Sequence, residues 1–182
     1  GGLPTDGIIS RGHTSGLSVG LKTDLSLVPS PYLDGTLDPF LNDHFQPMIQ
    51  TSRLCPYTCA FCTSGKNRGK LRAFNVDQVA AELDYIGRKF HDRPNHRMYI
   101  TDDNFGVMER DLEVAKKIIE TRDKHGYPKQ LFYYNDKRFT QTSRTLQEIC
   151  GSMVYHGVIL SMQSDNPETL KAINRRNVTD EH

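Results

Sequence analysis

The sequence lacks a long apolar run, and this absence excludes a membrane-spanning helix. Such a helix needs about 20 consecutive, mostly apolar residues, and no stretch of the 182 residues approaches that length. The N-terminus also lacks the basic-then-apolar pattern of a secretory signal. We therefore expect a soluble, cytoplasmic protein that does not bind a membrane.

The sequence also has little net charge and few cysteines. Lys and Arg total 23 against 22 for Asp and Glu, so the net charge of +1 gives no reason to expect a nucleic-acid partner. The 4 cysteines do not resemble the framework of a secreted disulfide domain, because three of them are crowded into the segment 55–62. This crowding favours a reducing compartment and a bound metal.

The composition and the apolar pattern of the sequence change near residue 46. Residues 1–46 are rich in Gly, Ser, Thr, Pro and Asp, and we interpret them as a linker or extended arm. From residue 47 to residue 182, short apolar or β-branched runs alternate with amphipathic stretches. This alternation predicts an α/β fold in which helices cover a parallel sheet.

Four βα units are visible in this second region. Asn75 and Gln78 form a plausible capping pair for the first helix, and Asn166 with Pro167 marks the start of the last one. The predicted strands cover 47–53, 97–101, 131–135 and 158–163, and the first three predicted helices cover 76–90, 111–124 and 143–153.

Cys55, Cys59 and Cys62 are spaced so that one loop can wrap three thiolates around a single metal centre. Thiolates select zinc, copper or iron-sulfur clusters. A structural zinc site needs four protein ligands, yet no further Cys or His follows at finger-like spacing, and Cys150 looks like a buried helix residue. Three ligands on a 4Fe-4S cluster leave one iron open to a small molecule. A zinc knob or plain buried thiols are the alternatives.

The motif Cys55-x-x-x-Cys59-x-x-Cys62, with Phe61 before its last cysteine, resembles that of the radical S-adenosylmethionine superfamily. The resemblance covers roughly residues 29–182 by the order of elements. It implies a partial (βα) barrel of which about four of six units are present, so that 47–182 is the N-terminal part of the core domain. It also implies a 4Fe-4S cluster whose open iron binds S-adenosylmethionine and reductively cleaves it to a 5'-deoxyadenosyl radical.

Two segments narrow the resemblance to one branch. Residues 30–40 resemble the segment that precedes the cluster in members with an upstream cobalamin-binding domain, and Thr101-Asp-Asp-Asn-Phe105 resembles a motif of that branch. Cobalamin, bound by a domain absent from this chain, and methyl transfer are therefore implied, with cyclisation or rearrangement as other reactions. Leu54 departs from the branch, which usually has Gly there. The chain begins Gly-Gly without Met, so we expect a piece of a longer protein.

The same resemblance implies further contacts and partners. Residues at strand ends are candidates for cofactor binding, although Asx residues also form turns, and Phe61 could equally pack in the core. We assign no catalytic residue beyond the cluster ligands, and we expect a small-molecule substrate and a reductant such as ferredoxin or flavodoxin. A non-catalytic iron-sulfur or zinc protein for electron transfer or scaffolding is the alternative function. The candidates are Phe61 beside adenine, Asp102, Asp103 and Asn104 near the methionine amino group, Ser161 and Gln163 for ribose or carboxylate, and, with turn chemistry equally weighted, Asn135 and Asp136.

Overall fold

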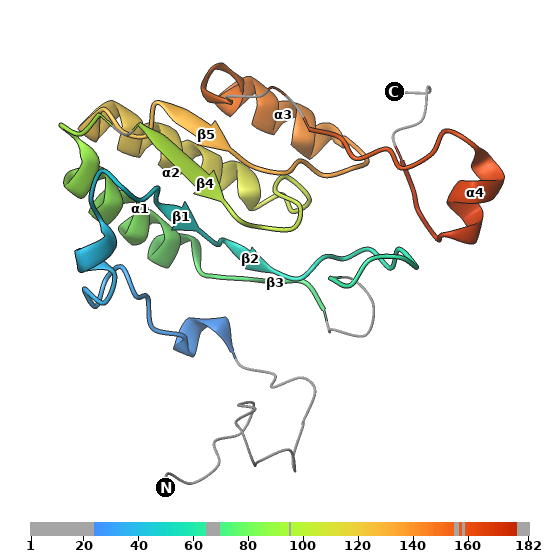
Figure 1. The fold of residues 1–182 in the computed structure, drawn as a ribbon, viewed down its shortest axis with the longest axis horizontal. Coiled ribbons are helices and arrows are strands. Elements are labelled where there is room, and N and C mark those ends of the chain that lie inside the picture. The colour runs from blue at the N-terminus through green and yellow to red at the C-terminus, as the bar shows by residue number, and fades with distance from the viewer. Residues whose placement is uncertain (1–23, 65–69, 95, 155–156, 158, 178–182) are drawn as a thin grey trace, which may run out of the picture.

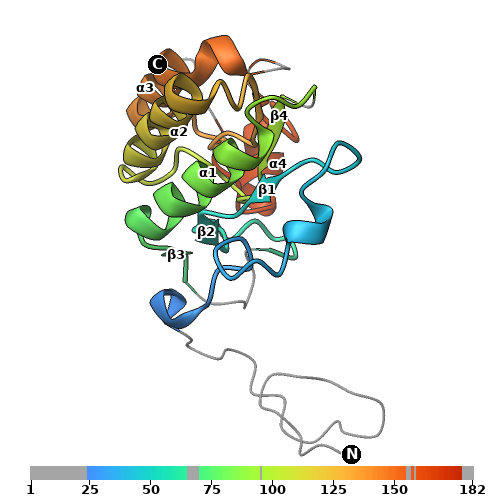
Figure 2. The same ribbon diagram turned by 90° about the vertical axis from the view of Figure 1, so that its left-hand side faces the viewer.

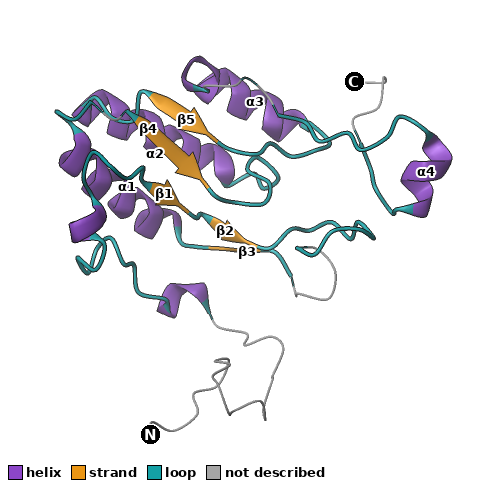
Figure 3. Cartoon of the chain, viewed as in Figure 1, coloured by secondary structure: helices purple, strands orange, loops and turns teal. Residues whose placement is uncertain are grey.

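The computed structural model describes residues 24–64, 70–94, 96–154, 157 and 159–177 (Figure 1). Helices and strands alternate through most of this part of the chain (Figure 3). The helices are α1 (Val76–Phe90), α2 (Asp111–His125), α3 (Gln141–Cys150) and α4 (Pro167–Ala172), with 3-10 turns at Leu25–Leu27, Asp38–Phe40 and Gly151–Met153; the strands are β1 (Met48–Ile49), β2 (Ser52–Arg53), β3 (Arg72–Ala73), β4 (Arg97–Ile100) and β5 (Gln130–Phe132).

The central sheet has the order β1-β4-β5, and both pairs are parallel. Helices α1, α2 and α3 cover one face of this sheet (Figures 1 and 2). Buried side chains of that face, such as Met98 and Ile100, pack with the apolar sides of α1 and α2 to form the core. The predicted α/β fold with a parallel sheet is therefore confirmed.

Helices α1 and α2 begin and end within one residue of the prediction, whereas α3 covers Gln141–Cys150 instead of 143–153. Asn75 caps α1 by accepting a hydrogen bond from the Asp77 backbone at 2.8 Å. The predicted capping partner, Gln78, instead donates toward the Val28 carbonyl at 3.4 Å. Helix α2 ends at Gly126, whose φ of 70° is left-handed and suits glycine.

Three of the four predicted strands differ from the structure. The third, 131–135, is shortened to β5 (Gln130–Phe132). The segment 47–53 is divided between β1 in the parallel sheet and β2, which pairs antiparallel with β3. The predicted fourth strand, 158–163, is wrong for its described residues, because 159–163 form no strand. Its Val158 lies outside the described residues. Among the described residues of this region, Val154 forms an isolated bridge with Leu131 of β5, and Gln163 has a φ of 66°, which an extended strand does not allow.

Part of the segment predicted as a linker contacts the core. Tyr32 and Leu41 are both 7% exposed and belong to the main apolar cluster. The Tyr32 hydroxyl donates to the Met48 carbonyl at 2.5 Å and accepts from the Met48 backbone N–H at 3.1 Å. These bonds fix the approach to β1, so residues 32–41 help to position the first strand.

In the part of the chain that the structure describes, no helix has the length and apolar character needed to cross a membrane.

One buried carboxyl group makes stability depend on pH. Glu82 in α1 is 8% exposed, and burial raises its pKa, with partial opposition from hydrogen bonds to Ser30 and Gln78. A raised folded-state pKa gives stability that is present below the unfolded value and is lost as pH rises through the folded value. We therefore expect Glu82→Gln to increase the free energy of unfolding at pH 7 in urea titrations.

The gain from Glu82→Gln should shrink as pH falls and vanish below the ordinary glutamate pKa of 4.5, where both side chains are neutral. Glu148→Gln is the matched control, because Glu148 is an exposed position of α3. It should change stability by no more than about 0.5 kcal/mol. A gain that persists at low pH would contradict the electrostatic explanation.

Candidate functional site

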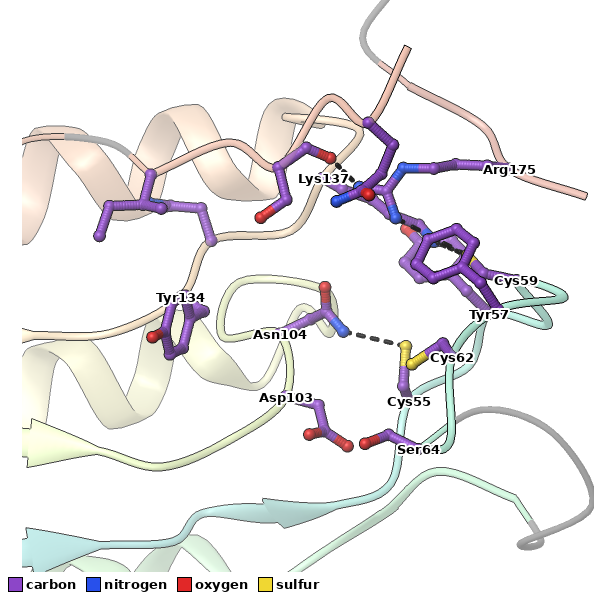
Figure 4. Close-up of a pocket in the computed structure, with 15 residues that line it drawn as sticks. Cys55, Tyr57, Cys59, Cys62, Ser64, Asp103, Asn104, Tyr134, Lys137 and Arg175 are labelled. Atoms are coloured by element: carbon purple, nitrogen blue, oxygen red, sulfur yellow. Dashed lines mark hydrogen bonds between the residues drawn. The ribbon is translucent and has the colours of Figure 1, made fainter. Parts of the chain in front are cut away.

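A cavity of about 220 Å³ lies at the carboxyl ends of the parallel strands. The loops that follow β2, β4 and β5 all contribute to its wall, as does the segment around α4 (Figure 4). Ligands of open α/β sheets bind at this edge because the loops converge there. The wall consists of Cys55, Tyr57, Cys59, Phe61, Cys62, Ser64, Asp103, Asn104, Tyr134, Asn135, Lys137, Ile159, Ser161, Gln163 and Arg175.

The three motif cysteines all line this cavity and are free thiols. Cys59 is buried, whereas Cys55 and Cys62 are half-buried. Burial raises the pKa of the Cys55 thiol, with partial opposition from the Tyr57 backbone N–H and the charge of Lys137. Among the described residues, no three Cys, His, Asp or Glu side chains are arranged to hold a single metal ion. The fourth cysteine, Cys150, is fully buried in α3, as predicted.

The loop of cysteines begins with a left-handed residue. Leu54 has a φ of 73°, which is unfavourable for a side chain with a Cβ atom and easy for glycine. Hydrogen bonds connect the loop to the residues after α4. The Ala60 backbone donates to the Ile173 carbonyl at 2.8 Å, and the Asn174 amide donates to the Thr58 carbonyl at 3.1 Å and to the Thr58 hydroxyl at 2.6 Å. Residues distant in sequence therefore hold the loop that carries the thiols.

The loop after β5 also contacts the cysteine loop. The Tyr57 hydroxyl donates to the Asp136 carboxylate at 2.5 Å, and the Lys137 ammonium lies 4.0 Å from the centre of the Tyr57 ring. Burial and the Asp136 carboxylate raise the pKa of Tyr57 well above its ordinary value. Tyr57 thus remains a neutral hydrogen-bond donor that fixes the middle of the motif.

Two side chains donate directly to motif sulfurs. The Asn104 amide lies 2.9 Å from the Cys55 sulfur, and the Lys137 ammonium lies 2.7 Å from the Cys59 sulfur (Figure 4). A third, longer contact of 3.8 Å joins Arg175 to Cys59. Both close donors follow parallel strands, so the fold itself directs them toward the cysteine loop.

The acidic loop after β4 divides into two roles. Asp102 is 1% exposed and does not line the cavity. Its carboxylate accepts from the Thr51 backbone at 2.6 Å, the Thr51 hydroxyl at 2.6 Å and the Ser52 hydroxyl at 2.7 Å. The Asp102 carboxylate therefore holds Thr51 and Ser52, at the start of β2, by hydrogen bonds. Asp103 and Asn104 line the cavity, and Asp103 is exposed there.

Asn135 has the least satisfied side chain of the cavity wall. It is 4% exposed, and neither its amide nitrogen nor its amide oxygen has a hydrogen-bond partner. Buried polar groups are normally hydrogen-bonded. The Asn135 amide is therefore free to pair with a cavity ligand that supplies both an acceptor and a donor.

The remaining predicted contacts also lie at the cavity. Phe61 is 50% exposed and is therefore not a core residue, and the Arg175 guanidinium stands 5.8 Å from its ring centre. Ser161 and Gln163 are exposed and line the same wall. The Ser161 carbonyl accepts a hydrogen bond from Arg175, which joins this segment to the cysteine loop.

Sequence reasoning missed Tyr57, Lys137 and Arg175. Tyr57 lies inside the cysteine motif, and Lys137 directly follows the Asn135-Asp136 pair at a predicted strand end. Both positions were thus marked by neighbouring candidates. Arg175 had no such signal, because its contact depends on how the chain returns after α4.

Two curated proteins resemble the chain at the level of sequence. A cobalamin-dependent radical SAM methyltransferase, TokK of Streptomyces tokunonensis, is 35% identical over 82% of this chain and 23% of its own length. The 2-(S-pantetheinyl)-carbapenam-3-carboxylate methyltransferase of Streptantibioticus cattleyicolor is 33% identical with the same coverage. The chain is therefore a relative of the cobalamin-dependent radical S-adenosylmethionine enzymes. It spans about a quarter of the length of these relatives, and no protein-family model matches it.

Solved structures of this enzyme group share the fold. The radical enzyme OxsB, with aqua-cobalamin and S-adenosylmethionine bound, matches with a TM-score of 0.58 at 20% identity over 82% of this chain and 22% of its own. The methyltransferase TsrM of Kitasatospora setae, with cobalamin and a [4Fe-4S] cluster bound, matches with a TM-score of 0.57 at 15% identity over 73% of this chain and 26% of its own. These neighbours hold the cofactors that the sequence analysis expects.

Proposed function

We propose that this chain holds a 4Fe-4S cluster on Cys55, Cys59 and Cys62 and belongs to an enzyme that reductively cleaves S-adenosylmethionine. The observation that carries this proposal is the presence of three free thiols and an unpartnered Asn135 amide in one cavity wall. The donor set suits the cluster, because thiolates are its usual ligands and three of them leave one iron open. When bound, the cluster supplies the electron that converts S-adenosylmethionine to methionine and a 5'-deoxyadenosyl radical.

The residues around the thiols would bind and orient S-adenosylmethionine. The exposed Asp103 carboxylate suits the amino group of the methionine part, because the two charges are opposite. Asn135 would exchange two hydrogen bonds with the ligand, while Ser161 and Gln163 would contact the ribose or the carboxylate. Phe61 offers a half-exposed ring for the adenine. Asp102 would act indirectly, because its carboxylate fixes Thr51 and Ser52 at the start of the cysteine loop.

The wider fold that we propose is a partial (βα) barrel. The helices cover one face of the sheet, and the register places Met48, Tyr99 and Phe132 side by side on the opposite face. Met48 is 56% exposed there, and the Tyr99 and Phe132 rings lie 5.0 Å apart. In a (βα) barrel such a face would line the interior, toward the substrate.

The overall reaction that we propose is cobalamin-dependent methyl transfer to a small molecule. The two curated relatives carry methyltransferase names, and both structural neighbours hold cobalamin. Cobalamin would be bound by another part of the full protein. The electron would come from a ferredoxin or flavodoxin in the cytoplasm, where reducing conditions keep thiols free.

Anaerobic reconstitution tests the core of this proposal. We expect about four irons and four sulfides per chain, with a cluster spectrum that changes when S-adenosylmethionine is added. A single tightly held zinc, with no spectral response to S-adenosylmethionine, would reject the proposal in favour of a scaffold or electron-transfer role.

A further inference from the structure

Lys137 is a buried cation with one sulfur as its hydrogen-bond partner. The residue is 6% exposed, and its ammonium lies 2.7 Å from the Cys59 sulfur and 4.0 Å from the centre of the Tyr57 ring. Its neighbour Asp136 instead accepts a hydrogen bond from the Tyr57 hydroxyl at 2.5 Å. Among the described residues, no ion pair joins Lys137 to a carboxylate.

A buried charge is normally paired with an opposite charge or bound to a metal site. A Cys59 thiolate bound to a cluster would supply this opposite charge 2.7 Å from the Lys137 ammonium. The position of Lys137 therefore fits a Cys59 that serves as a ligand. Asn104 provides the contrast, since it donates to the Cys55 sulfur at 2.9 Å with a neutral amide.

We propose that Lys137 is a positioning residue that places a positive charge on the Cys59 sulfur and thereby raises the reduction potential of the bound cluster. Hydrogen bonds to the sulfurs and the local charge are known determinants of cluster potential. Reduction adds one electron, supplied by the reductant, and breaks no bond. Because the reduced cluster carries one more negative charge, a cation at the ligand sulfur stabilises it more than the oxidised cluster. This inference rests on the proposed function.

The test is a dithionite titration of the anaerobically reconstituted protein, followed by electron paramagnetic resonance. At a fixed potential, we expect Lys137→Met to lower the ratio of reduced to oxidised cluster about tenfold or more, which is a shift of about 59 mV to more negative potential for a one-electron couple. Lys137→Arg should remain near the wild-type potential, because it keeps both the charge and an N–H donor. Lys129→Met is the matched control, because Lys129 is an exposed residue next to the opposite end of β5.

The possible results separate the inference from the proposed function. A wild-type protein that assembles no 4Fe-4S cluster would overturn both. Normal clusters with equal potentials in the wild type, Lys137→Met and Lys137→Arg would overturn the role of Lys137 and leave the proposed function intact. If Lys137→Met fails to assemble a cluster, Lys137→Gln replaces it, since the amide keeps a neutral donor like that of Asn104. A lowered potential in Lys137→Gln supports the inference, and an unchanged one rejects it.

Discussion

Replacing Cys59 by Ala is expected to lower the iron content of the reconstituted protein from about four per chain to near zero. Cys59 is the central thiol of the motif and is 2% exposed in the cavity wall. Only two of the three proposed thiolate ligands would then remain to hold the cluster. Loss of the Cys59 sulfur would also leave the Lys137 ammonium without its hydrogen-bond partner. Iron and sulfide assays with the visible spectrum would measure the effect.

Cys150→Ala is the matched control for this substitution. Cys150 is also a buried thiol, but it packs in the apolar core on α3 and does not line the cavity. Its replacement removes buried contacts and should cost about 1 kcal/mol of stability, while the iron content stays at the wild-type level. Loss of iron in Cys150→Ala, or retention of a full cluster in Cys59→Ala, would show that the ligands are wrongly assigned.

The sequence predicts the helices better than the strands, for a physical reason. A helix such as α1 carries its signals within itself, namely the apolar period and the Asn75 cap. A strand needs a partner. Residues 159–163 form part of an apolar run, but among the described residues after α3 it is Val154, at its bridge to Leu131, that meets β5. Likewise, the segment 47–53 is divided because Asp102 holds Thr51 and Ser52 by side-chain bonds that no local pattern predicts.

The site was predictable wherever its residues follow a motif or a strand end. The three cysteines, Asp103 and Asn104 come from such positions, and the structure brings them to one cavity. In the loop after β4, sequence spacing does not predict which of two adjacent aspartates faces the cavity. Asp102 and Asp103 are adjacent and chemically equal, yet one faces the protein and the other faces the cavity. Only the three-dimensional arrangement of donors separates them.

The residue before the motif, Leu54, is a second place where the sequence alone does not predict the local structure. Leu54 has a Cβ atom, yet its φ of 73° lies in the left-handed region that favours glycine. This conformation costs about 1–2 kcal/mol. Contacts elsewhere in the loop, including those of Tyr57 and Thr58, offset this cost and hold the loop in place.

Replacing Asn135 by Leu is expected to change stability and ligand affinity in opposite directions. Leu has a similar size and removes an amide that is buried without a partner. The free energy of unfolding of the ligand-free protein should therefore rise by about 1 kcal/mol. The affinity for S-adenosylmethionine should fall about tenfold or more, because the ligand loses two hydrogen bonds, and tenfold corresponds to about 1.4 kcal/mol.

Isothermal titration with S-adenosylmethionine and urea unfolding would measure the two effects of Asn135→Leu, and the iron content should remain that of the wild type. Asn42→Leu is the matched control, because Asn42 lies in the N-terminal segment outside the cavity. It should leave the affinity unchanged. If Asn135→Leu stabilised the protein and bound S-adenosylmethionine as tightly as the wild type, the buried amide would have no ligand to serve. If it lowered both stability and affinity, the amide would be a structural group whose loss disturbs the cavity. Opposite signs distinguish a binding residue from both alternatives.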